Sequence, residues 1–106
     1  MSANKTGAFK PIDNIEYSDG SVVSKQIIKS KVGNVTLFAF DAGEGLSEHA
    51  APFDALVQVV DGEAEIIIGG ERHTIGVNEA ILMPANISHA LKANKRFKMI
   101  LTMIKG

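Results

Sequence analysis

The sequence contains no cysteine. This absence excludes disulfide bonds, thiolate metal ligands and cysteine nucleophiles together, and it is compatible with a reducing cytoplasm, where we expect the protein to reside. No stretch approaches the ~18 apolar residues of a membrane span, and residues 1–10 have no apolar core of signal-peptide length. We therefore expect no membrane attachment.

A strong charge of either sign is also missing. The 11 Lys and Arg residues nearly balance the 12 Asp and Glu residues, and the formal net charge is -1. Nucleic acids and anionic membranes select basic faces, so neither is expected as a partner. What is present is a 106-residue chain with 45% hydrophobic residues, typical of one small globular domain. We predict a flexible N-terminal segment over 1–10 and a single domain over 11–106.

Long stretches with helical periodicity are absent as well. The dominant period is two, in short apolar runs broken by Gly, Asn, Asp and Pro, which indicates strands. The predicted strands are 22–29, 35–41, 56–60, 64–68, 73–75, 80–83, 88–93 and 97–104. Turn residues at 31–34, at Asp61-Gly62 and at Gly69-Gly70 predict hairpins between neighbouring strands. The fold class is therefore all-β, as a small antiparallel barrel or double sheet.

Residues 55–60 and 97–104 are apolar on both faces. An antiparallel strand of this kind is covered on both sides. One side would face the barrel interior, and we expect a second copy of the chain to cover the other side, including Ile100 and Ile104, in a homodimer. The alternative is that Ile12 and Ile15 cover this face within one chain.

Two spaced patterns lie between residues 43 and 93. In the first, Gly43 is followed after five residues by His49, and the pattern closes at Gly62. In the second, Pro84 precedes His89 at a spacing of five positions. These patterns resemble the two motifs of the cupin superfamily. The resemblance implies a small antiparallel double-stranded β-helix, a jelly-roll-like cupin barrel, in single-domain form.

The chain departs from the family motifs in two ways. Ala51 and Ala55 stand where the motifs have a second His and a Glu, and a methyl group has no lone pair to offer a metal. These changes reduce the metal site that the resemblance implies. Asn78 and Asn86 stand where the motifs have glycine, and Asn accepts a left-handed backbone more readily than other non-glycine residues. These changes preserve the fold.

The resemblance also implies that His49 and His89 lie on strands that face each other across the barrel mouth. We expect a cavity beside them that binds a small, partly apolar molecule, with hydrogen bonds from His89 and His49. Its predicted walls are Phe53, Val57, Met83 and Leu91. Met83, Met99 and Met103 are adaptable apolar residues that suit either a pocket or a core.

A metal-dependent enzyme of the dioxygenase or isomerase class is the alternative function. His49, His89 and Asp54 would then hold a divalent iron, manganese, zinc or nickel ion as two imidazoles and one carboxylate. Strand neighbours point to opposite faces, so Asp54 would need a β-bulge near Pro52-Phe53 to turn inward. Whether the protein is an enzyme stays open at this point, and no catalytic residue is assigned.

Two other polar features are assigned to solvent. His73 follows a turn and is expected on an exposed strand position. The cluster of Lys92, Lys95, Arg96 and Lys98 is interpreted as an exposed basic turn rather than an anion site.

Overall fold

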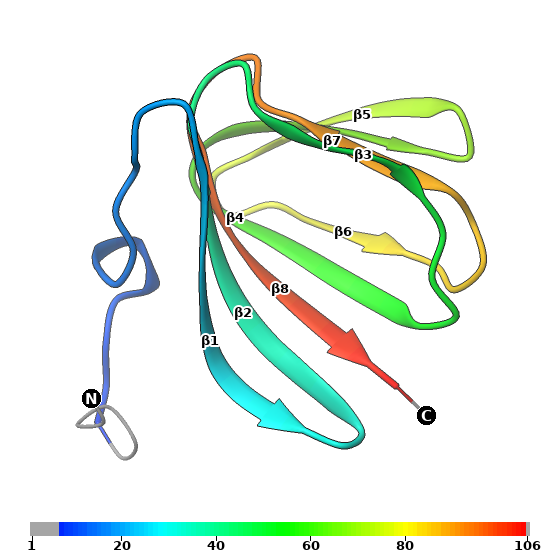
Figure 1. Cartoon of the computed structure of the whole chain (residues 1–106), viewed down its shortest axis with the longest axis horizontal. Helices are drawn as coiled ribbons and strands as arrows, with labels where there is room; N and C mark the ends of the chain where they lie inside the picture. Colours follow the sequence, from blue (N-terminus) through cyan, green and yellow to red (C-terminus); the bar gives the residue numbers. More distant parts are fainter. Residues whose placement is uncertain (1–6, 106) are drawn as a thin grey trace.

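The structure is a computed structural model that describes residues 7–105. The flexible segment predicted for 1–10 therefore falls mostly outside the described residues, and Gly106 also lies outside them. Within 7–105, the secondary structure is one 3-10 turn and eight strands: η2 (Pro11–Asp13), β1 (Val22–Ser30), β2 (Gly33–Phe40), β3 (Gly45–His49), β4 (Asp54–Ile68), β5 (Glu71–Gly76), β6 (Ala80–Met83), β7 (His89–Lys92) and β8 (Phe97–Ile104) (Figure 1). In this part of the chain no helix has the length and apolarity needed to cross a bilayer.

The strands form one curled antiparallel sheet that folds into two layers. Its order is β1-β2-β8-β4-β7-β3, with β5 and β6 also paired to β4. The first half of β4 lies between β8 and β6, and the second half lies between β7 and β5. Figure 1 shows the result: β1, β2 and β8 form one layer, β3, β7 and β5 form the other, and β4 belongs to both. The expected all-β double sheet is confirmed.

The hairpin predicted at Asp61-Gly62 is wrong. β4 runs through these residues as a single strand from Asp54 to Ile68. Its register against β8 shifts between Val59 and Asp61, and Gly62 has a positive φ of 72°. A Cβ at Gly62 would collide with the carbonyl oxygen of Arg96. The Asp-Gly pair therefore forms a bend at which one strand passes between layers, not a chain reversal.

The other turn predictions fare better. Gly69 and Gly70 both have positive φ and close the hairpin between β4 and β5. Asn78 and Asn86 have φ of 70° and 66°, which confirms that asparagine takes the left-handed positions there. Strand β3 lies outside the predicted ranges. Leu46 is its one apolar residue, so the strand lacks the apolar alternation that predicts one, and it lies at the end of the sheet with β7 as its partner.

The core lies between the two layers. Alternate residues of β2, β4 and β8 point into it, as the period of two predicts. The rings of Phe40 and Phe97 stack there with centroids 4.4 Å apart. The side chains of Val57, Ile66 and Met99 are also almost completely buried. Burial of each such side chain contributes about 1.5–3 kcal/mol to stability.

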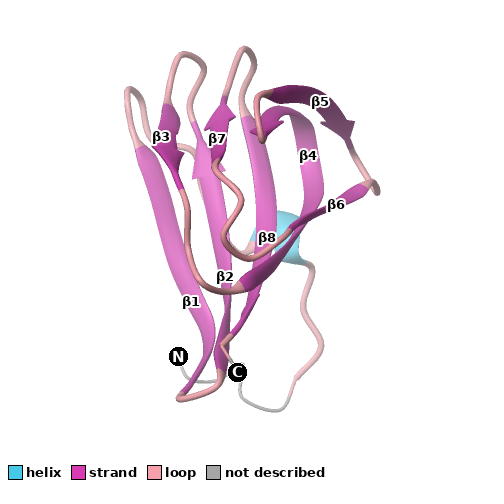
Figure 2. Cartoon of the chain, turned by 90° about the vertical axis from the view of Figure 1, so that its right-hand side faces the viewer, coloured by secondary structure: helices cyan, strands magenta, loops and turns pink. Residues whose placement is uncertain are grey.

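The outer face of the first layer is covered in part by the N-terminal segment. Ile15, 5% exposed, packs on Leu37 and Ala39 of β2, and Ile100 of β8 is partly buried against the same cluster. In Figure 2, η2 lies behind β8 and β4, on the side away from β6. The chain itself therefore covers this part of the face. Farther along the sheet, large apolar side chains stay uncovered: Ile28, Leu56, Leu82 and Ile104 are 57%, 36%, 55% and 58% exposed.

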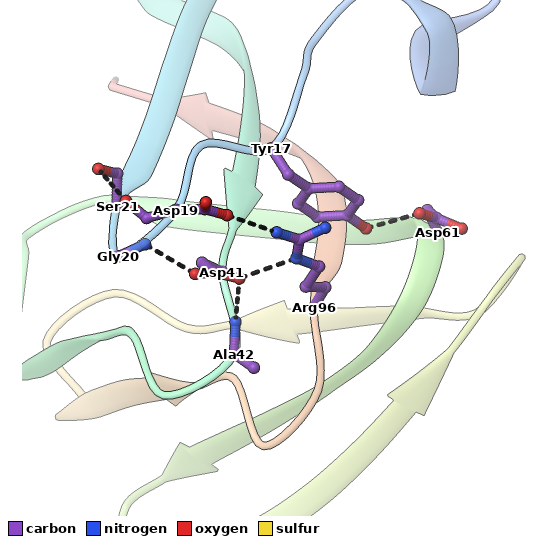
Figure 3. Close-up of polar contacts among 8 residues, drawn as sticks. All are labelled: Tyr17, Asp19, Gly20, Ser21, Asp41, Ala42, Asp61 and Arg96. Carbon is purple, nitrogen blue, oxygen red and sulfur yellow. Dashed lines mark hydrogen bonds and ion pairs between the residues drawn. The ribbon is translucent and has the colours of Figure 1, made fainter.

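Polar contacts around Arg96 fix the N-terminal segment in place (Figure 3). The guanidinium donates to Asp41 Oδ1 at 2.8 Å and to Asp19 Oδ1 at 3.0 Å, and its carbon lies 4.9 Å from the centroid of the Tyr17 ring. The Tyr17 hydroxyl donates to Asp61 Oδ2 at 2.6 Å. Burial and the Asp61 carboxylate raise the pKa of this hydroxyl well above its usual range, so it remains a donor. The hydrogen bond from Arg96 lowers the pKa of Asp41.

The prediction that the basic cluster is a solvent-exposed turn is wrong for Lys98. This residue is 8% exposed, and its Nζ donates to the backbone oxygen of Ile12 at 2.7 Å. Together with Arg96 it binds the N-terminal segment to the sheet. The sequence signal was available in the period of β8, because Lys98 has the same parity as Ile100 on the outer face.

Candidate functional site

A cavity of about 70 Å³ opens between the two layers. Its lining is apolar apart from two histidine rings, and consists of Leu46, His49, Ala51, Phe53, Ala55, Met83, His89, Leu91, Met99, Leu101 and Met103. Five of the six residues predicted to form the ligand pocket lie here. The sixth, Val57, is fully buried in the core and is not part of the lining. The chemistry of the cavity is therefore that of two imidazoles in hydrocarbon and thioether surroundings.

The two histidines meet across the pair formed by β3 and β7. His49 is directly opposite His89 in the register of these strands, and the ring centroids lie 4.4 Å apart at an interplanar angle of 68°. His89 is 6% exposed, whereas His49 lies at the exposed edge. One imidazole is thus inside the cavity and the other is at its mouth.

Backbone carbonyls fix the tautomer of both rings. Nδ1 of His49 lies 2.8 Å from the Ser47 oxygen, and Nδ1 of His89 lies 3.3 Å from the Ile87 oxygen. A carbonyl oxygen can only accept, so each Nδ1 carries a proton and each Nε2 of the neutral ring has a free lone pair. Among the described residues, Glu65 Oε2 is the one fully buried side-chain nitrogen or oxygen that has no hydrogen-bond partner. Nε2 of His89 is not such an atom, although it has no partner, because it is not fully enclosed by protein. Nε2 of His89 is therefore open to the cavity space.

Burial lowers the pKa of His89 below its usual 6.5, and the neighbouring His49 lowers it further. The hydrogen bond to the Ile87 carbonyl opposes this shift in part. His89 is consequently neutral at physiological pH, with its Nε2 lone pair available.

Ala55 lies on the floor of the cavity at 7% exposure. On the two neighbouring strands it is in register with Met83 of β6 and Met103 of β8. The position to which the cupin motif assigns a glutamate is thus a methyl group between two thioether side chains.

Asp54 does not join the two histidines. It pairs with Ile104 at the start of the β4–β8 ladder, which is regular from Asp54 to Val59, and Pro52 and Phe53 lie in a bend before the strand. Its Oδ1 accepts a hydrogen bond from the backbone nitrogen of Ala85 at 2.9 Å, and the side chain is not part of the cavity lining. The alternation of strand side chains places it on the face opposite Ala55.

The residues present therefore do not fit a divalent iron, manganese, zinc or nickel ion. Such sites need about three imidazole, carboxylate or thiolate ligands. Between residues 7 and 105, no group of three or more His, Cys, Asp or Glu side chains is arranged to hold a metal ion. His73 lies elsewhere, on β5, with its Nε2 3.4 Å from Glu71 Oε1.

Sequence reasoning missed several lining residues. Leu46 lies on β3, which is outside the predicted strand ranges. Leu101 could have been found, because it shares the parity of Met99 and Met103 on one face of β8. Lys105 lies near the edge of the cavity, with its Nζ 5.5 Å from the centroid of the Phe53 ring.

The fold and the site together place the chain in a class of proteins, the small two-layered antiparallel barrels, with a cavity at the histidine pair. Residues 36–105 match the cupin domain family, and the chain belongs to this family. The resemblance found in the sequence motifs is confirmed.

Solved structures give the same result. A conserved protein of unknown function from Streptococcus pyogenes is similar over 95% of this chain and 89% of its own, with a TM-score of 0.90 and 29% identity. A cupin 2 conserved barrel domain protein from Leptotrichia buccalis is 37% identical with a TM-score of 0.85. The match covers 89% of this chain but 46% of that one. A cupin superfamily protein from Desulfitobacterium hafniense has a TM-score of 0.83 at 28% identity, over 87% of this chain and 84% of its own. No curated protein matches the sequence.

Proposed function

We propose that this protein binds a small, partly apolar molecule that donates a hydrogen bond to the histidine pair. The observation that carries the proposal is the composition of the cavity. Its lining offers two imidazoles whose free nitrogens accept hydrogen bonds, while its nine other lining residues are Ala, Leu, Met or Phe. A ligand with an apolar body and one or two hydroxyl or N–H groups complements this arrangement.

The same acceptors discriminate against other ligands. A neutral Nε2 has no proton to give, so a carboxylate or phosphate inside the cavity would bring a further acceptor to two acceptors, and the nearby Lys105 ammonium lies outside the lining, at the edge beside Phe53. The lowered pKa of His89 keeps the ring neutral at physiological pH. We therefore expect neutral donors such as alcohols, phenols or amides in preference to anions.

The size of the cavity limits how much of the ligand is enclosed. About 70 Å³ is less than half of the roughly 150 Å³ cavity that encloses a benzene molecule in an engineered protein core. The donor group and the adjoining atoms would enter, while the rest of the molecule would lie at the mouth, beside Phe53 and His49.

Phenol and toluene test the proposal, because they differ in a hydroxyl against a methyl group of similar size. Binding is followed by NMR of ¹³C-labelled methionine methyl groups, since Met83, Met99 and Met103 all line the cavity. Phenol should bind about tenfold more tightly than toluene, because toluene leaves a buried acceptor unpaired at a cost of about 1–3 kcal/mol. His89→Phe should remove this preference, and His73→Phe, which changes a histidine outside the cavity, should retain it.

Equal affinities for phenol and toluene in the wild-type protein would refute the role of the histidines. The absence of saturable methyl shifts with either molecule would refute small-molecule binding in this cavity.

A further inference from the structure

We propose that the cavity also binds one monovalent copper ion, Cu(I), through the Nε2 atoms of His49 and His89 and the sulfur atoms of Met83 and Met103. This inference goes beyond the proposed function, and its test uses a different probe. It starts from the distribution of soft donor groups. Within residues 7–105, all three methionines and two of the three histidines line this one cavity.

The register of the sheet places the two thioether side chains on either side of one small residue. Met83 and Met103 lie directly opposite Ala55 on the strands at either side of it. Directly opposite residues have Cβ atoms about 4.5–5.5 Å apart on one face of a sheet, so each methionine Cβ lies at about this distance from the Ala55 Cβ. Ala55 extends no farther than its methyl group, so the space above it is left to the two long and flexible methionine side chains.

The histidines are prepared as metal ligands. A ligating histidine ordinarily donates its second ring N–H to a carbonyl or carboxylate, which holds the ring in place. His49 and His89 both do so, through Ser47 and Ile87. Two imidazoles on one ion, with metal–nitrogen bonds of about 2.0–2.1 Å meeting at about 90–110°, have ring centres roughly 4.5–5 Å apart. The observed separation of 4.4 Å is close to this geometry.

The donor set favours a soft monovalent ion over divalent ions. Thioether ligands select Cu(I) and imidazole ligands accept it, whereas carboxylate-containing sets suit harder ions. All four proposed ligands are neutral, so they offset no positive charge, and a single charge is less costly to bury than two. A cavity of about 70 Å³, small for an organic ligand, is ample for one ion.

The test is an anaerobic titration of the full chain with Cu(I) in competition with bicinchoninate, which reports free Cu(I) by colour. We expect one equivalent per chain, with no comparable retention of Zn(II), Mn(II) or Fe(II). X-ray absorption of the complex should include a sulfur shell near the usual metal–sulfur distance of about 2.3 Å.

Leucine substitutions separate the ligands from the lining. Met83→Leu and Met103→Leu keep the volume and apolarity of the cavity. Loss of a hydrogen-bond partner that supports a metal ligand weakens metal affinity ~10–100-fold, and loss of a ligand itself should weaken Cu(I) binding at least as much. Met99→Leu is the matched control: Met99 also lines the cavity, but it lies opposite Val59 and Phe38 rather than Ala55. The Cu(I) affinity of Met99→Leu should stay close to that of the wild type, and so should the Cu(I) affinity of His73→Ala.

Three results would overturn the proposal. These are failure of the wild-type chain to hold Cu(I) against the chelator, equal affinity for Zn(II), and unchanged Cu(I) affinity in both Met83→Leu and Met103→Leu. The outcome is independent of the phenol test, because the leucine variants retain the apolar cavity and its histidines. Loss of Cu(I) binding with phenol binding intact refutes only the copper site, and the reverse result refutes only the proposed function.

Discussion

Ala55→Glu should create a divalent-metal site in this barrel. Ala55 lines the same cavity as His49 and His89 and is 7% exposed. A carboxylate at this position would complete a set of two imidazoles and one carboxylate, which is sufficient for Mn(II), Fe(II) or Zn(II). We therefore expect this variant to bind such ions, and the wild-type chain to bind them weakly.

The magnitude follows from the burial of the new side chain. Without metal, a carboxyl group in this apolar cavity costs about 1–3 kcal/mol in lost hydration, and its pKa rises. For a domain of about 100 residues, each kcal/mol changes Tm by roughly 4–8 °C, so Tm should fall by roughly 5–20 °C. An ion present at 100 times its Kd contributes about 2.7 kcal/mol. Saturating Zn(II) or Mn(II) should therefore raise the Tm of the variant by roughly 10–20 °C.

Scanning calorimetry with and without a chelator measures this difference. Leu56→Glu is the matched control, because Leu56 is the next residue of β4, points to the outer face and is 36% exposed. Its Tm should not depend on metal. The reasoning is refuted if Ala55→Glu shows no metal-dependent rise in Tm, or if Leu56→Glu shows the same rise.

Three further predictions concern the stability and association of the barrel. Ile15 is 5% exposed, so Ile15→Ala should lower the free energy of unfolding, measured in urea, by about 2–3 kcal/mol. Ile28 is 57% exposed, and Ile28→Ala should lower it by less than about 0.5 kcal/mol. Equal effects would contradict the packing of the N-terminal segment. The lowered pKa of His89 means that the unfolded chain binds more protons below pH 6.5, so stability should fall as the pH drops from 6.5 towards the lower folded pKa. Urea titrations across this range should show a shallower dependence in His89→Phe, and an unchanged slope would assign the effect to other groups. The homodimer stays a prediction: if a second copy covers the exposed outer face, Ile104→Glu should shift the sedimentation profile to monomer, whereas a wild-type chain that already sediments as a monomer would exclude it.

Most of the strands could be predicted from the sequence because their apolar residues alternate. The ranges 80–83 and 97–104 agree with β6 and β8 at both ends. Asp61-Gly62 misled the prediction because the same two residues favour a hairpin turn and a bend within a strand. Which of the two forms is decided by β8, whose residues 97–104 pair with β4 across a long separation in sequence. Local propensity carries no information about that pairing.

The candidate site was predictable to a similar degree. Motif spacing identified His49 and His89, which the structure brings into contact. Strand parity argued against Asp54, and the regular ladder around this residue agrees with parity. The placement of Met83 and Met103 on both sides of Ala55 could not be predicted, because it depends on the register of three strands that are distant in the sequence.

The continuous strand β4 has a consequence for how the protein opens. β4 is hydrogen-bonded to β5, β6, β7 and β8, and so holds both layers. The amide hydrogens of β4 that bond to β8, inside the sheet, should therefore exchange only on global unfolding, whereas those that bond to the edge strands β5 and β6 can exchange when these strands fray. Neither layer can detach as a subunit of lower stability. Ala55 is the one lining residue of the cavity that lies on β4, so the floor of the cavity should stay closed while the outer strands fluctuate, and a molecule should enter through the mouth.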